Sequence, residues 1–188
     1  MGNPTAETNF EVVSSDVVRR GVVFDLTVDR IRYDDGVEGV REVAVHPGGA
    51  VVAAITDAGT IVVVRQFRYP LGAWMTELPA GKLDPDEDPD LCAPRELEEE
   101  TGYRAGRIDK LGAIATTPGF CTEILHLYLA RDLVAGAANR ERGEEGMTVE
   151  EITFEEFDRR TLDGEIIDAK TIAAVALAKL RLARDDDA

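Results

Sequence analysis

Cysteine is scarce in this chain, which contains only Cys92 and Cys121 among its 188 residues. Two cysteines are too few for the disulfide framework of a small secreted protein. The two histidines add no Cys and His spacing that resembles a zinc site. We therefore interpret both cysteines as reduced thiols, in a chain long enough to bury its core without cross-links.

Long apolar runs are also missing from the sequence. No stretch approaches the roughly 20 residues that a membrane-spanning helix needs. Residues 1–10 are polar and lack the basic and apolar regions of a secretory signal. We expect a cytoplasmic globular protein without a membrane partner.

Basic residues are outnumbered, since 21 Lys and Arg stand against 37 Asp and Glu and give a net charge of -16. Binding to the phosphate backbone of a nucleic acid depends on clustered Lys and Arg, so a nucleic-acid partner is not expected. A phosphorylated small molecule is still compatible, because divalent cations can bridge carboxylates and an anionic substrate. The positions of the carboxylates therefore decide between function classes.

Hydrophobic periodicity predicts strands in the first part of the chain and a helix at 90–101. The expected early strands are 10–14, 21–33, 39–46, 50–56 and 60–67, the last two forming a hairpin in a mixed sheet. Later segments are expected as strands at 107–115 and 123–129, a loop at 134–146, a strand at 147–154, a helix from Glu155 and a helix at 168–182 capped by Asp168. Pro94 lies inside the first helix, so we expect a loose turn around 91–93.

Glu96, Glu99 and Glu100 are the most informative acidic residues. On a helix they are three and four residues apart, so their side chains project from one face toward a common point. Carboxylates at these spacings repel one another, and a divalent cation between them would relieve the repulsion. Oxygen ligands suit Mg²⁺, with Mn²⁺ possible, and these ions also bind substrate phosphates. Taken alone, a run of this kind is more often a solvent-exposed acidic face than a metal site.

The residues around this run resemble the Nudix box, the signature of a hydrolase family. Its fixed positions are filled here by Gly81, Glu87, Arg95, Glu96, Leu97, Glu99, Glu100, Gly102 and Tyr103. So many matches in one short segment argue against chance, although Pro94 departs from the commonest box sequences. The resemblance therefore favours the metal site over the exposed acidic face.

This resemblance implies an α/β fold, the Nudix αβα sandwich with a mixed central sheet and an N-terminal antiparallel β region. It implies that Mg²⁺ is held by Glu96, Glu100 and the main-chain carbonyl of Ala80, with Glu99 as a further ligand or as a hydrogen-bond acceptor beside the metal. Arg95 and Glu87 would form a structural pair that braces the loop. Gly81 and Gly102 would be structural as well, Gly102 at the end of the helix.

Segments outside the box resemble the ADP-ribose pyrophosphatase branch of the family. They are Glu77-Leu78-Pro79-Ala80-Gly81 before the box, Thr117-Pro118-Gly119-Phe120 after it, and His46-Pro47-Gly48-Gly49-Ala50. The branch implies hydrolysis of the pyrophosphate bond of ADP-ribose to AMP and ribose 5-phosphate. A broader nucleoside diphosphate sugar hydrolase, acting for example on GDP-mannose or a UDP-sugar, is one alternative. A nucleotide-sugar sensor that does not cleave its ligand is another.

The branch also implies a homodimer in which residues 1–48 are exchanged, followed by a catalytic domain at 49–184 and a disordered acidic tail at 185–188. Substrate contacts are expected from Arg41, Arg68, Glu77, Phe120 and, on the apolar side of a base slot, Val23 or Phe24. A guanidinium can stack on a base or form two hydrogen bonds to a phosphate, so both arginines are suited to these contacts.

The general base is expected in the acidic stretch Arg142-Gly143-Glu144-Glu145-Gly146, by the same resemblance. Glu144 and Glu145 are both candidates. We favour Glu145 because it lies nearer the following strand.

Overall fold

The computed structural model describes residues 8–140 and 146–186, which divide into two units. One unit comprises residues 1–47 and 117–123, and the other comprises residues 48–116 and 124–188. The division after Pro47 lies beside the boundary expected at residue 48. The segment 117–123 belongs to the N-terminal unit, which the sequence did not indicate.

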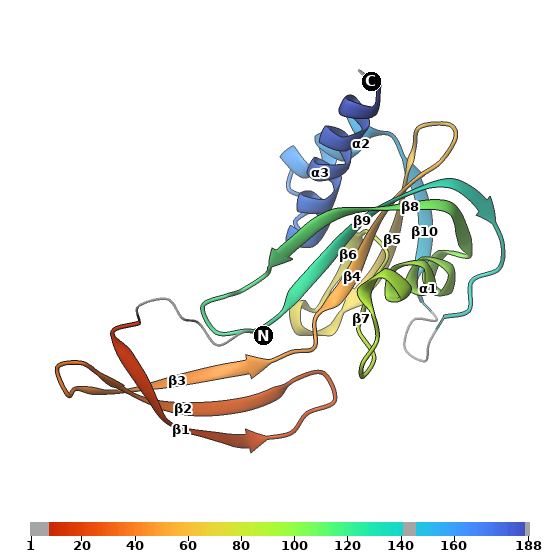
Figure 1. Cartoon of the computed structure of the whole chain (residues 1–188). Coiled ribbons are helices and arrows are strands. Elements are labelled where there is room, and N and C mark those ends of the chain that lie inside the picture. Colours follow the sequence, from red (N-terminus) through yellow and green to blue (C-terminus); the bar gives the residue numbers. More distant parts are fainter. Residues whose placement is uncertain (1–7, 141–145, 187–188) are drawn as a thin grey trace. The chain divides into compact units, whose positions relative to one another are not determined.

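The first unit is an antiparallel sheet of strands β1 (Phe10–Arg19), β2 (Asp25–Tyr33) and β3 (Glu38–Val45), in that order. The segment 117–123 runs beside the end of β3, because the Ala44 amide donates to the Phe120 carbonyl (2.7 Å) and the Thr122 amide donates to the Ala44 carbonyl (3.0 Å). The expected N-terminal antiparallel region is therefore confirmed (Figure 1). The strand expected at 21–33 begins only at Asp25, after a turn.

The second unit is built on a mixed sheet of seven strands. These are β4 (Gly49–Ile55), β5 (Ile61–Arg68), β6 (Ala73–Glu77), β7 (Ala80–Lys82), β8 (Tyr103–Ala115), β9 (Ile124–Ala135) and β10 (Thr148–Ile152). The order is β10-β5-β4-β9-β8, with β6 paired to β5 and β7 paired to β4. β4 and β9 are parallel, whereas their other pairings are antiparallel, so the mixed sheet is confirmed.

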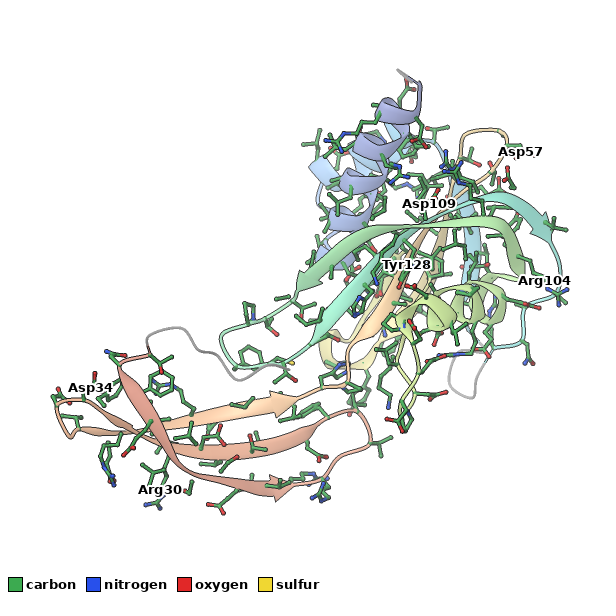
Figure 2. The ribbon with its side chains drawn as sticks, in the orientation of Figure 1. Arg30, Asp34, Asp57, Arg104, Asp109 and Tyr128 are labelled. Carbon is green, nitrogen blue, oxygen red and sulfur yellow. The ribbon has the colours of Figure 1, made fainter. Side chains whose placement is uncertain are left out.

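Alternate residues of β4 face opposite helices, because successive side chains of a strand point to opposite faces. Val51 and Ala53 pack in the core with α2 (Phe154–Leu162) and α3 (Ala169–Asp186). Val52 packs in the core with α1 (Pro89–Thr101). The sheet thus lies between α1 and the α2–α3 pair, as Figure 1 shows, and Figure 2 shows Tyr128 on the α1 side. The αβα arrangement expected from the resemblance is confirmed.

Several local expectations need correction. The strands β6 and β7, which flank Leu78 and Pro79, were not predicted, because each is only five or three residues long. β9 continues to Ala135, into the segment expected as a loop. The helix α3 extends to Asp186, and Asp185 pairs with Arg131 (2.9 Å), so this residue is not part of a disordered tail.

Two further observations concern the expected class of protein. Both cysteines are free, and burial raises the pKa of Cys92 to about 12, so that its thiol stays protonated. In residues 8–140 and 146–186, no helix has the length and apolar character needed to cross a membrane.

Candidate active site

The segment that leads into the box is fixed to the central sheet. β7 pairs with β4, placing Ala80 opposite Val51 and Gly81 opposite Ala50. The Pro79 carbonyl accepts a hydrogen bond from the Val52 amide (3.0 Å). This short strand therefore brings the main chain of Ala80 and Gly81 to the side of the sheet covered by α1.

Glu96 and Glu100 of α1 lie against this strand. A β-carbon on Gly81 would overlap the carboxyl group of Glu96, so only glycine leaves room for that side chain. Glu100 is 2% exposed, and its Oε2 atom accepts a hydrogen bond from the Ala80 amide (3.2 Å). The sequence pattern of a glycine followed by a glutamate-bearing helix thus has a direct steric reason.

Arg95 holds three carboxylates of the box. Its Nε and Nη2 atoms donate to the two oxygens of Glu87, at 2.9 Å each, while Nη1 donates to Glu96 (2.7 Å) and Glu99 (3.0 Å). The hydrogen bonds from Arg95 lower the pKa of Glu87 to about 2, so Glu87 is ionised at neutral pH. The Arg95–Glu87 pair expected from the resemblance is present, and Arg95 also engages the two glutamates expected at the metal.

Both ends of α1 are held by local contacts. Asp88 caps the first turn by accepting from the Asp90 amide (3.0 Å), and the helix continues through Pro94 without interruption. Gly102 ends the helix with a φ of 79°, a left-handed conformation that favours glycine. Beyond β9, Arg140 Nε donates to the Glu100 carbonyl (3.1 Å), which ties that part of the chain to the end of α1.

A buried carboxylate and two cations lie at the strand end that precedes the box. Arg68 Nε and Nη2 donate to the two oxygens of Glu77, at 2.7 and 2.6 Å, and Lys170 of α3 also donates to Glu77. Glu77 is 1% exposed. Burial raises its pKa, but the hydrogen bonds from Arg68 and the charge of Lys170 outweigh burial and lower the pKa below its usual value.

Lys170 is a site residue that the sequence analysis missed. Its signal was the stretch Asp168-Ala169-Lys170-Thr171 at the start of the last helix, from which only the cap was predicted. That cap is present, since Asp168 Oδ2 accepts from the Thr171 amide (3.0 Å).

Other predicted site residues lie in the first unit or outside the described residues. Arg41 donates to the Tyr33 hydroxyl (2.5 Å) and is exposed, and the three apolar candidates, Val23, Phe24 and Phe120, are 56%, 47% and 60% exposed. Glu144 and Glu145 lie in 141–145, outside the described residues.

The comparison with family models now decides the family. The model of the NUDIX domain matches residues 46–175, more than half of the chain. The chain belongs to the Nudix family.

Three relatives match this chain over about three quarters of its length. The ADP-ribose pyrophosphatase of Bacillus subtilis is 42% identical over 76% of this chain and 78% of the relative. That of Mycobacterium tuberculosis is 39% identical over 77% and 70%, respectively. The GDP-mannose pyrophosphatase of Cronobacter sakazakii is 33% identical over 76% and 79%.

Among solved structures, the crystal structure of an ADP compounds hydrolase matches with a TM-score of 0.83, covering 95% of this chain and 96% of that chain. Its sequence identity is 19%, so this likeness shows the fold alone.

The donor set of the Nudix box fits a hard divalent cation. Glu96, Glu99 and Glu100 supply carboxylate oxygens, which suit such an ion, and the contacts of Arg95 Nη1 show that Glu96 and Glu99 can both reach one positive charge. As the side chains lie, no three His, Cys, Asp or Glu residues of the described chain are grouped to hold one ion. The expected common point is thus not assembled in this arrangement, because Arg95 engages two carboxylates while Glu100 accepts from the Ala80 amide.

Replacing Arg95 tests its bracing role in the Nudix box. Arg95→Met removes the cation that Glu87, Glu96 and Glu99 share. The wild-type Arg95 side chain is only 28% exposed. Loss of one partner of a largely buried pair destabilises, and allowing for partial exposure we expect about 2 kcal/mol. For a chain of this size that lowers the melting temperature by about 4–8 °C.

Thermal unfolding measures this effect. Arg104→Met is the matched control, because Arg104 also pairs with a glutamate of α1, Glu98, but is 72% exposed. Equal melting temperatures for the two variants would show that Arg95 has no bracing role.

Proposed function

We propose that this protein is a Mg²⁺-dependent hydrolase that cleaves the pyrophosphate bond of ADP-ribose to AMP and ribose 5-phosphate. The observation on which the proposal depends is the arrangement of α1, which presents Glu96 and Glu99 to one positive charge and buries Glu100 against the Ala80 amide. The similarity to ADP-ribose pyrophosphatases supports the choice of substrate.

In this proposal Glu96, Glu99, Glu100 and the Ala80 carbonyl hold Mg²⁺, with Mn²⁺ as a substitute. When bound, the ion neutralises charge on the pyrophosphate and favours attack by water. Glu87 and Arg95 keep the box in place. Glu145, or alternatively Glu144, accepts the proton from the attacking water.

Arg68 is the proposed anion-binding residue of this unit. Its guanidinium is held along one edge by Glu77, and its side chain is 39% exposed, so Arg68 is not closed off from a phosphate in solution. The charge of Glu100 also raises the pKa of Arg68, after the larger effect of Glu77, which indicates that Arg68 lies within electrostatic range of the box.

A homodimer with exchanged N-terminal residues is part of the proposal. Arg41 and Phe120 would contact the substrate. Val23 or Phe24 of the partner chain would form the apolar side of the base slot. The exposed valines of the N-terminal sheet, such as Val12 at 59% and Val40 at 58%, support a covered surface. A solution mass equal to one chain at micromolar concentration would contradict the dimer.

A broader specificity is the second candidate, because the similarity to a GDP-mannose pyrophosphatase favours it. A non-cleaving sensor of nucleotide sugars is the third. It is less favoured because a sensor needs no complete set of metal-binding carboxylates.

A hydrolysis screen separates these candidates. ADP-ribose, GDP-mannose and UDP-glucose are compared at equal concentration with Mg²⁺ present or chelated. We expect ADP-ribose to give a kcat/KM at least about tenfold above the others, with products AMP and ribose 5-phosphate, because one contact difference of about 1.4 kcal/mol has this effect. Equal rates on all three would favour the broader hydrolase. Binding without cleavage in Mg²⁺ would favour the sensor, and full activity under chelation would contradict the metal role.

A further inference from the structure

Four charged side chains of the second unit form one connected group, with Glu77 at its centre. Arg68 occupies both oxygens of Glu77, and Lys170 donates to Oε2, the oxygen that Arg68 Nη2 also contacts. Lys170 pairs in addition with Asp168 at 2.9 Å. The side chains of Lys170 and Asp168 are only 14% and 16% exposed, so this group is shielded from solvent on the helix side.

The first turn of α3 fixes where Lys170 lies. Thr171 is fully buried and its hydroxyl accepts a hydrogen bond from the Leu78 amide (2.8 Å). The same hydroxyl donates to Asp168 at 2.6 Å. The residue after Glu77 is therefore attached to the residue after Lys170, which holds the ammonium and the carboxylate together.

Arg68 is oriented by this group. Nε and Nη2 take part in the bidentate pair with Glu77, whereas Nη1 does not. A guanidinium held along one edge presents its remaining donors in a fixed direction, which suits a phosphate oxygen.

Lys170 sets the charge balance behind Arg68. Within this group of four, the charges of Arg68 and Lys170 balance those of Glu77 and Asp168. Without Lys170, Glu77 and Asp168 would share one cation, and the group would be negative where an anion must bind. Glu77 would also lose the contact that holds it from the helix side.

We propose that Lys170 is a positioning residue, which holds Glu77 so that Glu77 directs the Arg68 guanidinium toward a phosphate of the nucleoside diphosphate sugar. This inference rests on the proposed function, in which Arg68 binds the substrate. Lys170 does not itself contact the substrate, and its effect passes through Glu77 and Arg68.

Steady-state kinetics of Lys170→Met test the role. We expect KM for ADP-ribose to rise about tenfold while kcat changes less than about threefold, the pattern of lost ground-state and transition-state binding alike. Lys179→Met is the matched control, because Lys179 lies on the same helix, pairs with Asp158 and lies over the ring of Phe154. It should leave both parameters within about twofold of the wild type.

A double-mutant cycle shows whether Lys170 acts through Arg68. In an Arg68→Ala background, Lys170→Met should raise KM by less than about twofold, since coupled residues have non-additive effects. A full tenfold rise in that background would overturn the proposal, as would an unchanged KM in the single variant. If Lys170→Met shows no cooperative thermal unfolding and is therefore not folded, Lys170→Gln replaces it, with the same expected results.

A readout without turnover separates this inference from the proposed function. The Nε–H signal of Arg68 in a nitrogen-15 NMR spectrum is assigned by its loss in Arg68→Ala. We expect Lys170→Met to shift this signal and Lys179→Met to leave it unchanged, and an unmoved signal in Lys170→Met would contradict the positioning role. Failure of the wild type to hydrolyse any nucleoside diphosphate sugar would end the proposed function and leave the NMR result to decide on Lys170.

Discussion

Glu100→Gln is expected to lower kcat for ADP-ribose at least about a hundredfold while leaving the fold intact. Stabilisation of developing charge by a single preorganised group is worth about this much in other enzymes. The substitution keeps the size of the side chain, and the amide oxygen of glutamine can still accept the hydrogen bond from the Ala80 amide. Only the negative charge that would hold Mg²⁺ is removed.

The burial of Glu100 makes this experiment informative. At 2% exposure a carboxylate has little contact with water, so its retention is costly unless it binds a cation or strong donors. Turnover at saturating substrate and Mg²⁺ measures the effect, and the melting temperature checks the fold. Glu98→Gln is the control, because Glu98 lies on the same helix, is 40% exposed and pairs with Arg104. Near wild-type turnover in Glu100→Gln would exclude the metal role of Glu100.

The layers of the fold could be predicted from the sequence because each depends on local pattern. Residues 50–56 form an apolar run, which predicted a buried strand, and the spacing of apolar residues at 90–101 predicted the helix. The structure shows that this strand is buried on both faces and that the helix covers one of them. The strands β6 and β7 could not be predicted in this way. They are short, and their pairing depends on β5 and β4 rather than on their own residues.

The site was predictable only where neighbouring residues in the sequence form it. Glu96, Glu99 and Glu100 share one helix, as the sequence predicted, but spacing alone did not show that Arg95 contacts Glu96 and Glu99 while Glu100 accepts from the Ala80 amide. Lys170 was missed because it joins Glu77 from 93 residues away, a contact that only the packing of α3 on the sheet creates. Arg95 was assigned to Glu87, but its contacts to Glu96 and Glu99 depend on side-chain direction that spacing does not give.

Asn139 and Arg140, which precede the segment proposed to carry the general base, contact the end of α1. Asn139 donates to the Glu99 carbonyl (3.0 Å) and Arg140 donates to the Glu100 carbonyl (3.1 Å). A β-carbon on Gly146 would lie 3.1 Å from the ring of Trp74, so little room is left beside that glycine. The described chain thus reaches Arg140 beside the end of α1, and Arg140 directly precedes in sequence the segment in which the base is proposed.

Glu145→Gln is accordingly expected to lower kcat at least about a hundredfold, because a positioned general base contributes about 10²–10⁴ to the rate. A base accepts a proton only when ionised, so wild-type kcat should fall at acid pH. The variant should lose that acid limb, since glutamine does not titrate. Glu144→Gln, one residue away, is the matched control and should keep both the rate and the limb. The reverse outcome would assign the base to Glu144, and unchanged profiles in both variants would place the base outside this segment.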